Sequence, residues 1–280
     1  MSTELHARFM EEVLEDLKND RLVLPTLPEV ALRVREVVDD DDASIADLTR
    51  IIASDAALSA RLVHVANSPL LRGNRDVQTL EEAATRLGMR LIRDMVTSMV
   101  MQQMFQATTE VTDRKLREVW EHSTQVAAIA HALASQFTPL KPEEAMLAGL
   151  VHDIGKLPLL TKAEEQPEIL EDEDALDQLL WRLHPRIGGV ILRAWGFPEA
   201  LAAVAEQHEK LDREVPEADY VDVVTVANLQ AHMGGDHPHA DADWDKVPAV
   251  HRLGLNPEVS VIEMDETAAE IEEVESLLRS

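Results

Sequence analysis

The sequence predicts an all-α protein. Apolar residues recur at helical spacing in nearly every segment, as Leu5, Phe9 and Val13 do near the start. No segment shows the sustained alternation of apolar and polar residues that is typical of a half-buried strand. Residues 221–226 favour strand by residue type, but the Ala and Leu residues around them keep helical spacing. The chain has 280 residues, of which 45% are hydrophobic, so it can bury a sizeable core.

The first part of the chain is predicted to be a bundle of capped helices. Ser44 and Asp55 can each accept a hydrogen bond from the first turn of a helix. Thr79, followed three residues later by Glu82, forms a capping-box pattern, and a glycine ends that helix. The expected helices cover 4–19, a segment opened by Pro28, a segment opened by Ser44, Asp55 to about Asn67, Thr79 to Gly88, and a Met-rich stretch, 89–107.

The second part is predicted to be helical as well, with two irregular stretches. A long helix is expected from Thr112 to about Phe137, and another from Pro142 towards Gly155. Shorter helices fit 175–183, 186–195, 198–208 and 218–233. An acidic loop with a short turn fits 163–174, an irregular segment fits 234–257, and an amphipathic helix fits 264–279. This organisation predicts three segments: 1–110, 111–235 and 236–280.

Composition excludes several classes of protein. The chain has 26 Lys and Arg against 53 Asp and Glu, a net charge of −27, and such a surface repels the phosphates of duplex nucleic acid. It has no cysteine, hence no disulfide or thiolate zinc site. No apolar run reaches the roughly 20 residues of a membrane span, and the polar N-terminus lacks the pattern of a signal peptide. A cytoplasmic protein is expected.

Histidine is the residue that points to chemistry. Of the 11 histidines, four form a pattern with a carboxylate: His122, His152, His184 and His208, with Asp153 directly after His152. Neutral imidazoles and a carboxylate are ligands for iron, manganese, nickel or zinc. A bound metal would lower the pKa of a water molecule, and Lys156 could then hold a phosphate group.

A structural interpretation competes with the metal site. Asp153 and Lys156 could form an ion pair at a helix end, and histidines in helical proteins commonly have no ligand role. Among the histidines outside the pattern, we expect His64, His131 and His251 to be exposed or to have hydrogen-bond partners. We expect His232, His237 and His239 to be solvated.

The same residues resemble two related families. The segment of about 112–230 resembles the HD superfamily of metal-dependent phosphohydrolases, with His122 as the first His and His152-Asp153 as the His-Asp pair. The first half is similar to the HDOD family, the HD-related output domain of bacterial signalling, and together the motifs cover about residues 20–235. The motifs that carry this resemblance are 24–28 (LPTLP), 51–58 (IIASDAAL), 66–68 (ANS) and 87–88 (LG). The resemblance implies an N-terminal helical bundle packed on an HD-like lobe, with a regulatory role.

A comparison with HD-GYP phosphodiesterases implies a site that lacks some of the metal ligands and the Gly-Tyr-Pro stretch of that family. Glu118 resembles that family's Glu one turn before the first His, and His184 and His208 resemble later metal ligands. Gln207 replaces a His, Asn228 replaces the final metal-binding Asp, and 212–216 (DREVP) replace the Gly-rich stretch that ends in Gly-Tyr-Pro. A two-metal phosphodiesterase of cyclic di-GMP is therefore not expected.

Three hypotheses follow. The first is a non-catalytic signalling module with a residual metal or ligand site, possible further ligands being Glu118, Gln207 and Asn228. Its partners would be signalling proteins or a second copy of the chain. The second is a metal-dependent phosphohydrolase of a nucleotide or cyclic dinucleotide, in which Asp153 bridges metals and Lys156 and Arg186 bind phosphate. The third is a scaffold in which the histidines are relics.

Overall fold

The computed structural model describes residues 2–19, 21–105, 109–235, 237–257, 260–263 and 265–279. Within these ranges every regular element is helical and no strand occurs, which confirms the all-α prediction. None of the helices in these ranges is both long enough and apolar enough to cross a lipid bilayer.

The chain divides into two compact units, each built from two stretches of sequence. Unit 1 comprises residues 1–26 and 105–263, and unit 2 comprises residues 27–104 and 264–280. The predicted segments 1–110, 111–235 and 236–280 are each continuous, whereas the compact units are not. The first helix groups with unit 1 because it contacts α11 and buries the side chains of Phe9 and Val13.

Unit 2 is a helical bundle whose predicted caps are present. The Ser44 hydroxyl accepts from the Asp47 N–H and the Asp47 carboxylate accepts from the Ser44 N–H. The Thr79 hydroxyl accepts from the Glu82 N–H, 3.1 Å away. The helix expected over 89–107 ends at Met101 and is followed by a 3-10 turn, while 106–108 lie outside the described residues. The elements are α2 (Glu29–Asp39), α3 (Ile45–Ile52), α4 (Ala56–Ala66), α5 (Leu80–Leu87), α6 (Met89–Met101), η1 (Gln102–Met104) and α15 (Asp265–Arg279).

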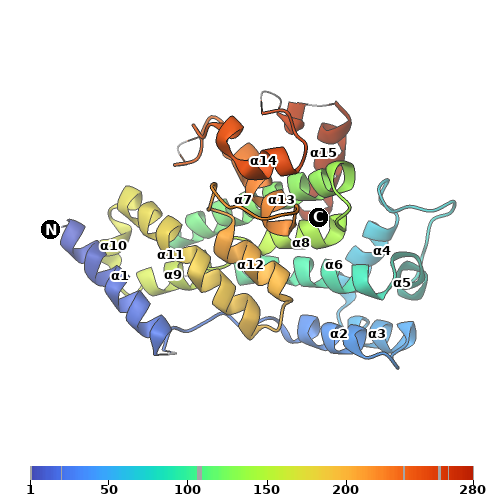
Figure 1. The fold of residues 1–280 in the computed structure, drawn as a ribbon. Helices are drawn as coiled ribbons and strands as arrows, with labels where there is room; N and C mark the ends of the chain where they lie inside the picture. The colour runs from blue at the N-terminus through green and yellow to red at the C-terminus, as the bar shows by residue number, and fades with distance from the viewer. Residues whose placement is uncertain are drawn as a thin grey trace. The chain divides into compact units, whose positions relative to one another are not determined.

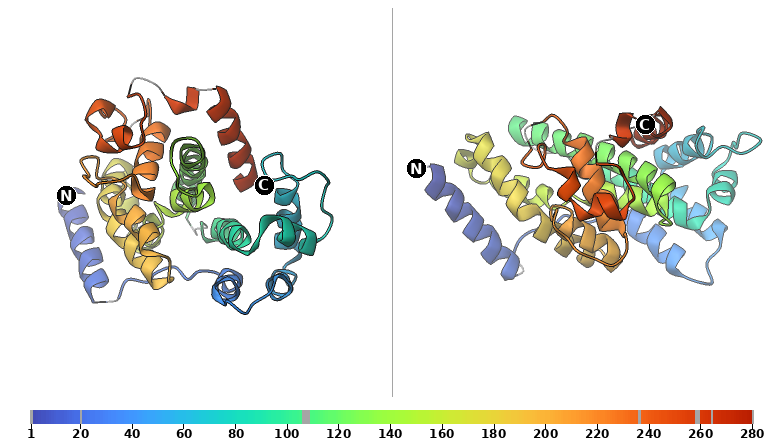
Figure 2. Two further views of the ribbon diagram at one scale, coloured as in Figure 1. Left: turned by 45° about the vertical axis from the view of Figure 1, so that its right-hand side comes forward. Right: turned by 45° about the horizontal axis from the view of Figure 1, so that its top comes forward.

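Unit 1 packs around the long helix α7, with α8 and α13 against it (Figures 1 and 2). α7 begins at Glu110 rather than near Thr112, because the Thr109 hydroxyl caps it by accepting from the Thr112 N–H. The elements are α1 (Ser2–Lys18), α7 (Glu110–Phe137), α8 (Pro142–Val151), α9 (Lys156–Ala163), α10 (Pro167–Leu170), α11 (Glu173–Ala194), α12 (Glu199–Gln207), α13 (Tyr220–Ala231), η2 (Trp244–Lys246), α14 (Pro248–Arg252) and η3 (Val261–Glu263).

Three predictions about unit 1 were wrong. The helices expected over 175–183 and 186–195 are one helix, α11, that continues through Pro185, so His184 lies within a helix and not between two helices. Proline removes one backbone donor, but the buried apolar side chains on both sides of it hold the helix together. Residues 156–163 form α9, which was not expected, and the segment 234–257 contains the short helices η2 and α14.

Two glycines allow the backbones around the candidate site to approach closely. A Cβ on Gly149 of α8 would lie 2.7 Å from the Ala127 Cα of α7. A Cβ on Gly155 would lie 2.1 Å from the His184 carbonyl oxygen of α11. Any larger residue would push these backbones apart. Glycine at 155 therefore brings the turn that carries Asp153 against the helix that carries His184.

Candidate metal centre

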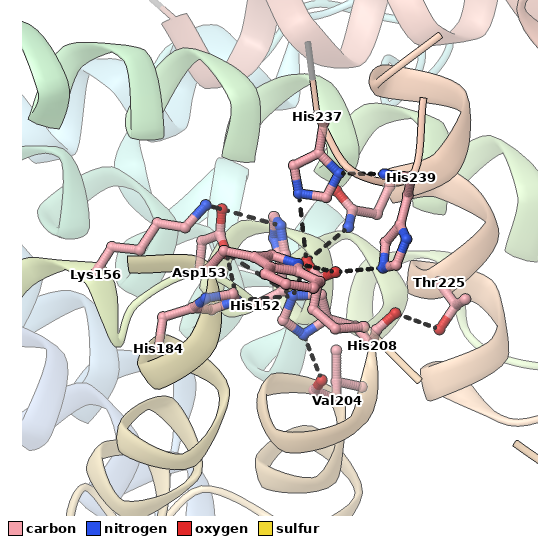
Figure 3. A network of polar contacts seen from close by, with 12 residues as sticks. His152, Asp153, Lys156, His184, Val204, His208, Thr225, His237 and His239 are labelled. Atoms are coloured by element: carbon pink, nitrogen blue, oxygen red, sulfur yellow. Dashed lines mark hydrogen bonds and ion pairs between the residues drawn. The ribbon is translucent and has the colours of Figure 1, made fainter. Parts of the chain in front are cut away.

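The centre is assembled from residues at the C-terminal ends of α8 and α12 and from one residue within α11. His152 follows α8, His208 follows α12, and His184 precedes Pro185 within α11. Asp153 lies in the turn between α8 and α9. All four side chains are at most 2% exposed, so the structure brings the predicted ligands together in the interior (Figure 3).

Backbone carbonyls fix the proton on each of the three buried imidazoles. The Nδ1 of His152 lies 2.6 Å from the Gly149 oxygen, that of His184 lies 2.8 Å from the Leu180 oxygen, and that of His208 lies 3.0 Å from the Val204 oxygen. A carbonyl only accepts, so each Nδ1 carries the proton and donates it. Each neutral imidazole then presents an Nε2 lone pair to the centre, which is the arrangement of metal-ligating histidines.

Two of the three separations between the ligand atoms of Asp153, His184 and His208 match those that a metal ion would impose. His184 Nε2 is 3.1 Å from Asp153 Oδ1 and 3.2 Å from His208 Nε2, and His208 Nε2 is 3.8 Å from Asp153 Oδ1. Metal bonds of about 2.0–2.2 Å at tetrahedral or octahedral angles place neighbouring ligand atoms about 2.8–3.6 Å apart, so the His208–Asp153 separation is the one that exceeds this range. We refer to Asp153, His184 and His208 as the first trio.

Two buried atoms in the centre have no hydrogen-bond partner among the described residues. These are His152 Nε2 and Asp153 Oδ1. Asp153 Oδ1 receives no hydrogen bond from the nearby His184 Nε2 because the proton of that ring is on Nδ1. Buried polar atoms normally have a partner, so two exceptions at one place fit a site that holds a cation. The His/Asp cluster therefore has the donor set and geometry of a transition-metal site.

A second set of ligand atoms shares the same carboxylate. His152 Nε2 lies 3.4 Å and His122 Nε2 3.9 Å from Asp153 Oδ2. We refer to Asp153, His122 and His152 as the second trio. In each trio the ligand atoms all lie within 4.8 Å of one another. Lys156 Nζ also contacts Asp153 Oδ2, at 2.5 Å.

Burial controls the charge of the imidazoles. Burial lowers the pKa of His122, His152 and His184 to about 3, so these rings are neutral at physiological pH. Burial also acts to lower the pKa of His208, but the hydrogen bond and charge of Glu209 raise it above its ordinary value. Burial opposes ionisation of Asp153, yet His152 and Lys156 hold the pKa of that carboxyl well below its usual range.

Three histidines expected to be solvated instead form a wall beside the centre. The His232 ring stacks on His122, with centroids 4.4 Å apart, and on His237, with centroids 3.7 Å apart. His239 Nε2 lies 2.8 Å from Glu209 Oε2, which also accepts from Trp181 Nε1 at 3.0 Å. These three side chains are half-buried and not solvated as expected, because the segment that follows α13 returns to α7, where His232 stacks on His122. Sequence spacing carries no signal for that return.

A cavity of about 610 Å³ lies outside this wall. It is lined by Lys115, Glu118, Val119, His122, Lys156, Asp174, Asp177, Gln178, Leu180, Trp181, His232, His237 and Pro238. The lining includes Lys156 and His122 but none of His152, Asp153, His184 and His208. The cavity thus reaches the rim of the centre and not its buried ligands.

The remaining candidate residues lie at or beyond the rim. Asn228 is buried and its Oδ1 lies 2.9 Å from His122 Nε2. Glu118 lines the cavity but pairs with Arg114 and Lys115. Gln207 accepts from Arg213 Nε at 3.2 Å. Arg186 is exposed and lies two residues from His184, about 200° around α11, so it faces away from the centre.

Comparison with known proteins identifies the family. The family model described as "HDOD domain" matches residues 24–211. The chain belongs to the HDOD family. This confirms the resemblance found in motifs such as LPTLP at 24–28.

Solved structures of related chains share the fold. A proposed metal-dependent phosphohydrolase from Shewanella amazonensis SB2B is 31% identical, covering 98% of this chain and 99% of that one, with a TM-score of 0.86. An HDOD domain protein of unknown function from Geobacter sulfurreducens is 23% identical, covering 98% and 99%, with a TM-score of 0.69. A proposed signal transduction protein from Marinobacter aquaeolei VT8 is 20% identical, covering 98% and 66%, with a TM-score of 0.62.

One curated relative is longer than this chain. An uncharacterised protein from Treponema pallidum (strain Nichols) is 23% identical over an alignment 232 residues long, which covers 77% of this chain and 44% of the relative. The chain therefore spans less than half the length of that relative.

Proposed function

We propose that this chain is a non-catalytic signalling module of the HDOD family that holds a divalent transition metal in unit 1. The first trio would bind the ion, and His152 would offer a further lone pair. Imidazole and carboxylate donors fit iron, manganese, nickel or zinc. The metal would act as a conformational input, because binding it fixes three helices relative to one another.

The closure of the centre is the observation that carries this proposal. Structural metal sites are enclosed by protein ligands, whereas catalytic sites keep a coordination position open to substrate. Here the four central side chains are at most 2% exposed and none of them lines the adjacent cavity. His122, His232 and His237 stand between that cavity and the buried ligands.

Metal binding would couple to a proton. His208 has a raised pKa, so its metal-free imidazole carries a proton on Nε2 over a wider pH range, 3.3 Å from Glu209 Oε1. A metal ion at His208 Nε2 must displace that proton. The output would pass through contacts with other signalling proteins or with a second copy of the chain.

Elemental analysis tests the proposal. The protein is purified anaerobically without a tag or chelator, beside His184→Ala and the control His64→Ala, which removes an exposed histidine of unit 2. We expect at least one transition-metal ion per chain in the wild type and the control, and less than a tenth of that in His184→Ala. Circular dichroism verifies that the variants are folded. Absence of metal from the wild type would overturn the proposal.

A metal-dependent phosphohydrolase of a nucleotide or cyclic dinucleotide is the second candidate. The cavity beside the centre favours it, because Lys156 lies on its wall and could contact a phosphate. The 31% identical relative is a proposed enzyme of this class. The metal-loaded protein is assayed with nucleotides and cyclic dinucleotides. Saturable hydrolysis that is lost in Asp153→Asn would favour this candidate over the signalling module, and no turnover is the expected result.

A further inference from the structure

The two trios share Asp153 but differ in where their protons lie. In the first trio, both imidazoles donate Nδ1–H to backbone carbonyls, so each ring in its neutral form has an Nε2 lone pair for a metal. In the second trio, His152 has the same arrangement but His122 does not. His122 uses Nε2, the atom that would have to ligate, in a hydrogen bond with Asn228.

Glu209 determines the direction of that hydrogen bond. The Asn228 Nδ2 group lies 3.4 Å from Glu209 Oε1, and a carboxylate accepts but does not donate. The amide therefore turns its NH₂ towards Glu209 and its carbonyl Oδ1 towards His122. An amide oxygen also only accepts, so His122 Nε2 carries the proton and donates it. His122 has no lone pair available on the atom that faces Asp153.

The ammonium group of Lys156 forms an ion pair with Asp153 Oδ2, the carboxylate oxygen of the second trio. Lys156 Nζ lies 2.5 Å from Asp153 Oδ2, and the lysine side chain is 16% exposed. Asp153 Oδ1, the oxygen of the first trio, receives no hydrogen bond from any described residue. The positive charge of the second trio is thus supplied by the protein itself, and a second divalent ion would have to displace it against Coulomb repulsion.

We infer that the centre binds one metal ion per chain, at the first trio, and that Lys156 and the Glu209–Asn228–His122 chain of hydrogen bonds exclude a second ion from the second trio. This inference rests on the proposed function, since it specifies how many ions the proposed site holds. The two excluding features are independent of each other. Removing both should open the second trio to a metal.

The test is the number of metal ions per chain, measured after equilibration with Mn²⁺ or Zn²⁺ and removal of free ion. We compare the wild type with Lys156→Met, Asn228→Asp and the double variant. Methionine removes the ammonium at similar length, and aspartate gives position 228 an anionic oxygen that can itself ligate a metal beside Asp153 and His152. Lys162→Met is the control, because Lys162 pairs with Asp16, 2.7 Å away in the same unit. We expect one ion in the wild type and control and two in the double variant.

Each outcome separates the inference from the proposed function. Two ions in the wild type would overturn the inference and leave metal binding intact. A double variant that is folded by circular dichroism but still holds one ion would overturn the roles of Lys156 and Asn228. No ion in the wild type would overturn the proposed function, and the inference with it. If the double variant does not fold, the single variants decide, since neither should lose the first ion and each should bind a second ion at least tenfold more tightly than the wild type.

Discussion

The two compact units bury very different kinds of residues. The interior of unit 2 is apolar, with large side chains such as Leu48, Leu62 and Ile92 fully buried. Asp94 is the one buried titratable residue that the structure describes there, and Arg93 pairs with it at 2.7 Å. Unit 1 buries a carboxylate and three imidazoles at one place, with two atoms left without hydrogen-bond partners. Apolar packing stabilises by itself, whereas a buried polar cluster costs free energy unless a ligand offsets the cost.

Tryptophan fluorescence can distinguish the unfolding of unit 1 from that of unit 2. All four tryptophans of the chain, Trp120, Trp181, Trp195 and Trp244, lie in unit 1. Trp181 donates to Glu209 beside the centre. Tryptophan fluorescence therefore reports on unit 1 alone, while far-ultraviolet circular dichroism reports on the helices of both units.

The largest expected effect is the loss of stability of the metal-free protein in mild acid. In the folded chain the pKa values of His122, His152 and His184 are lowered to about 3, whereas an unfolded histidine titrates near 6.5. Between these pH values the unfolded state binds more protons, so stability is present above pH 6.5 and falls as the pH drops towards 3. The loss is up to about 1.4 kcal/mol per pH unit for each histidine.

His208 acts in the opposite direction. Its folded pKa is raised, so its contribution is present below pH 6.5 and is lost as the pH rises through that higher value. The test is urea unfolding of the metal-free protein at several pH values, followed by fluorescence and by circular dichroism. We expect the fluorescence midpoint to fall most steeply below pH 6.5, and added metal to raise the midpoint at neutral pH, where the neutral imidazoles can bind it. A pH-independent midpoint between 6.5 and 4 would contradict the contrast between the units.

The next effect comes from cutting a cavity into the apolar interior of unit 2. Leu62 of α4 is fully buried, so Leu62→Ala should lower the free energy of unfolding by about 2–5 kcal/mol. The metal content should not change, because all proposed ligands lie in unit 1. Leu32→Ala is the control, since Leu32 is 37% exposed. Loss of metal from a folded Leu62→Ala protein would show that the centre depends on unit 2.

A smaller stability change but a large change in metal content is expected from Gly155→Ala. The new Cβ would meet the His184 carbonyl, so the turn that carries Asp153 must move away from α11. Such overpacking costs about 1–3 kcal/mol. The shift separates Asp153 from His184, and metal content should fall at least tenfold. Gly73→Ala is the control, because its Cβ would have only ordinary contacts with Arg86. Metal retention by Gly155→Ala would show that the first trio tolerates this movement.

The sequence predicted the fold class and the residues of the buried His/Asp cluster but not the surroundings of that cluster. Helical periodicity and caps such as Ser44 and Thr79 are local signals, and the structure confirms them. The His152-Asp153 pair was found through local spacing and family resemblance. Its Nδ1 partners are backbone carbonyls, and the wall of His232, His237 and His239 depends on a chain reversal. Neither leaves a periodic or compositional trace in the sequence.

The smallest expected effect concerns a residue that the sequence placed at the site. Arg186 and His184 share α11, yet His184 is fully buried and Arg186 is exposed on the opposite side of the helix. A two-residue step rotates about 200° around an α-helix, so no rotamer of Arg186 shares the surroundings of His184. Arg186→Ala should change the free energy of unfolding by less than about 0.5 kcal/mol and leave the metal content unchanged. Urea unfolding and elemental analysis measure both quantities beside His184→Ala. A reduced metal content in Arg186→Ala would mean that the exposed face of α11 contributes to metal binding. The buried face that carries His184 and the exposed face that carries Arg186 would then not be separate in function.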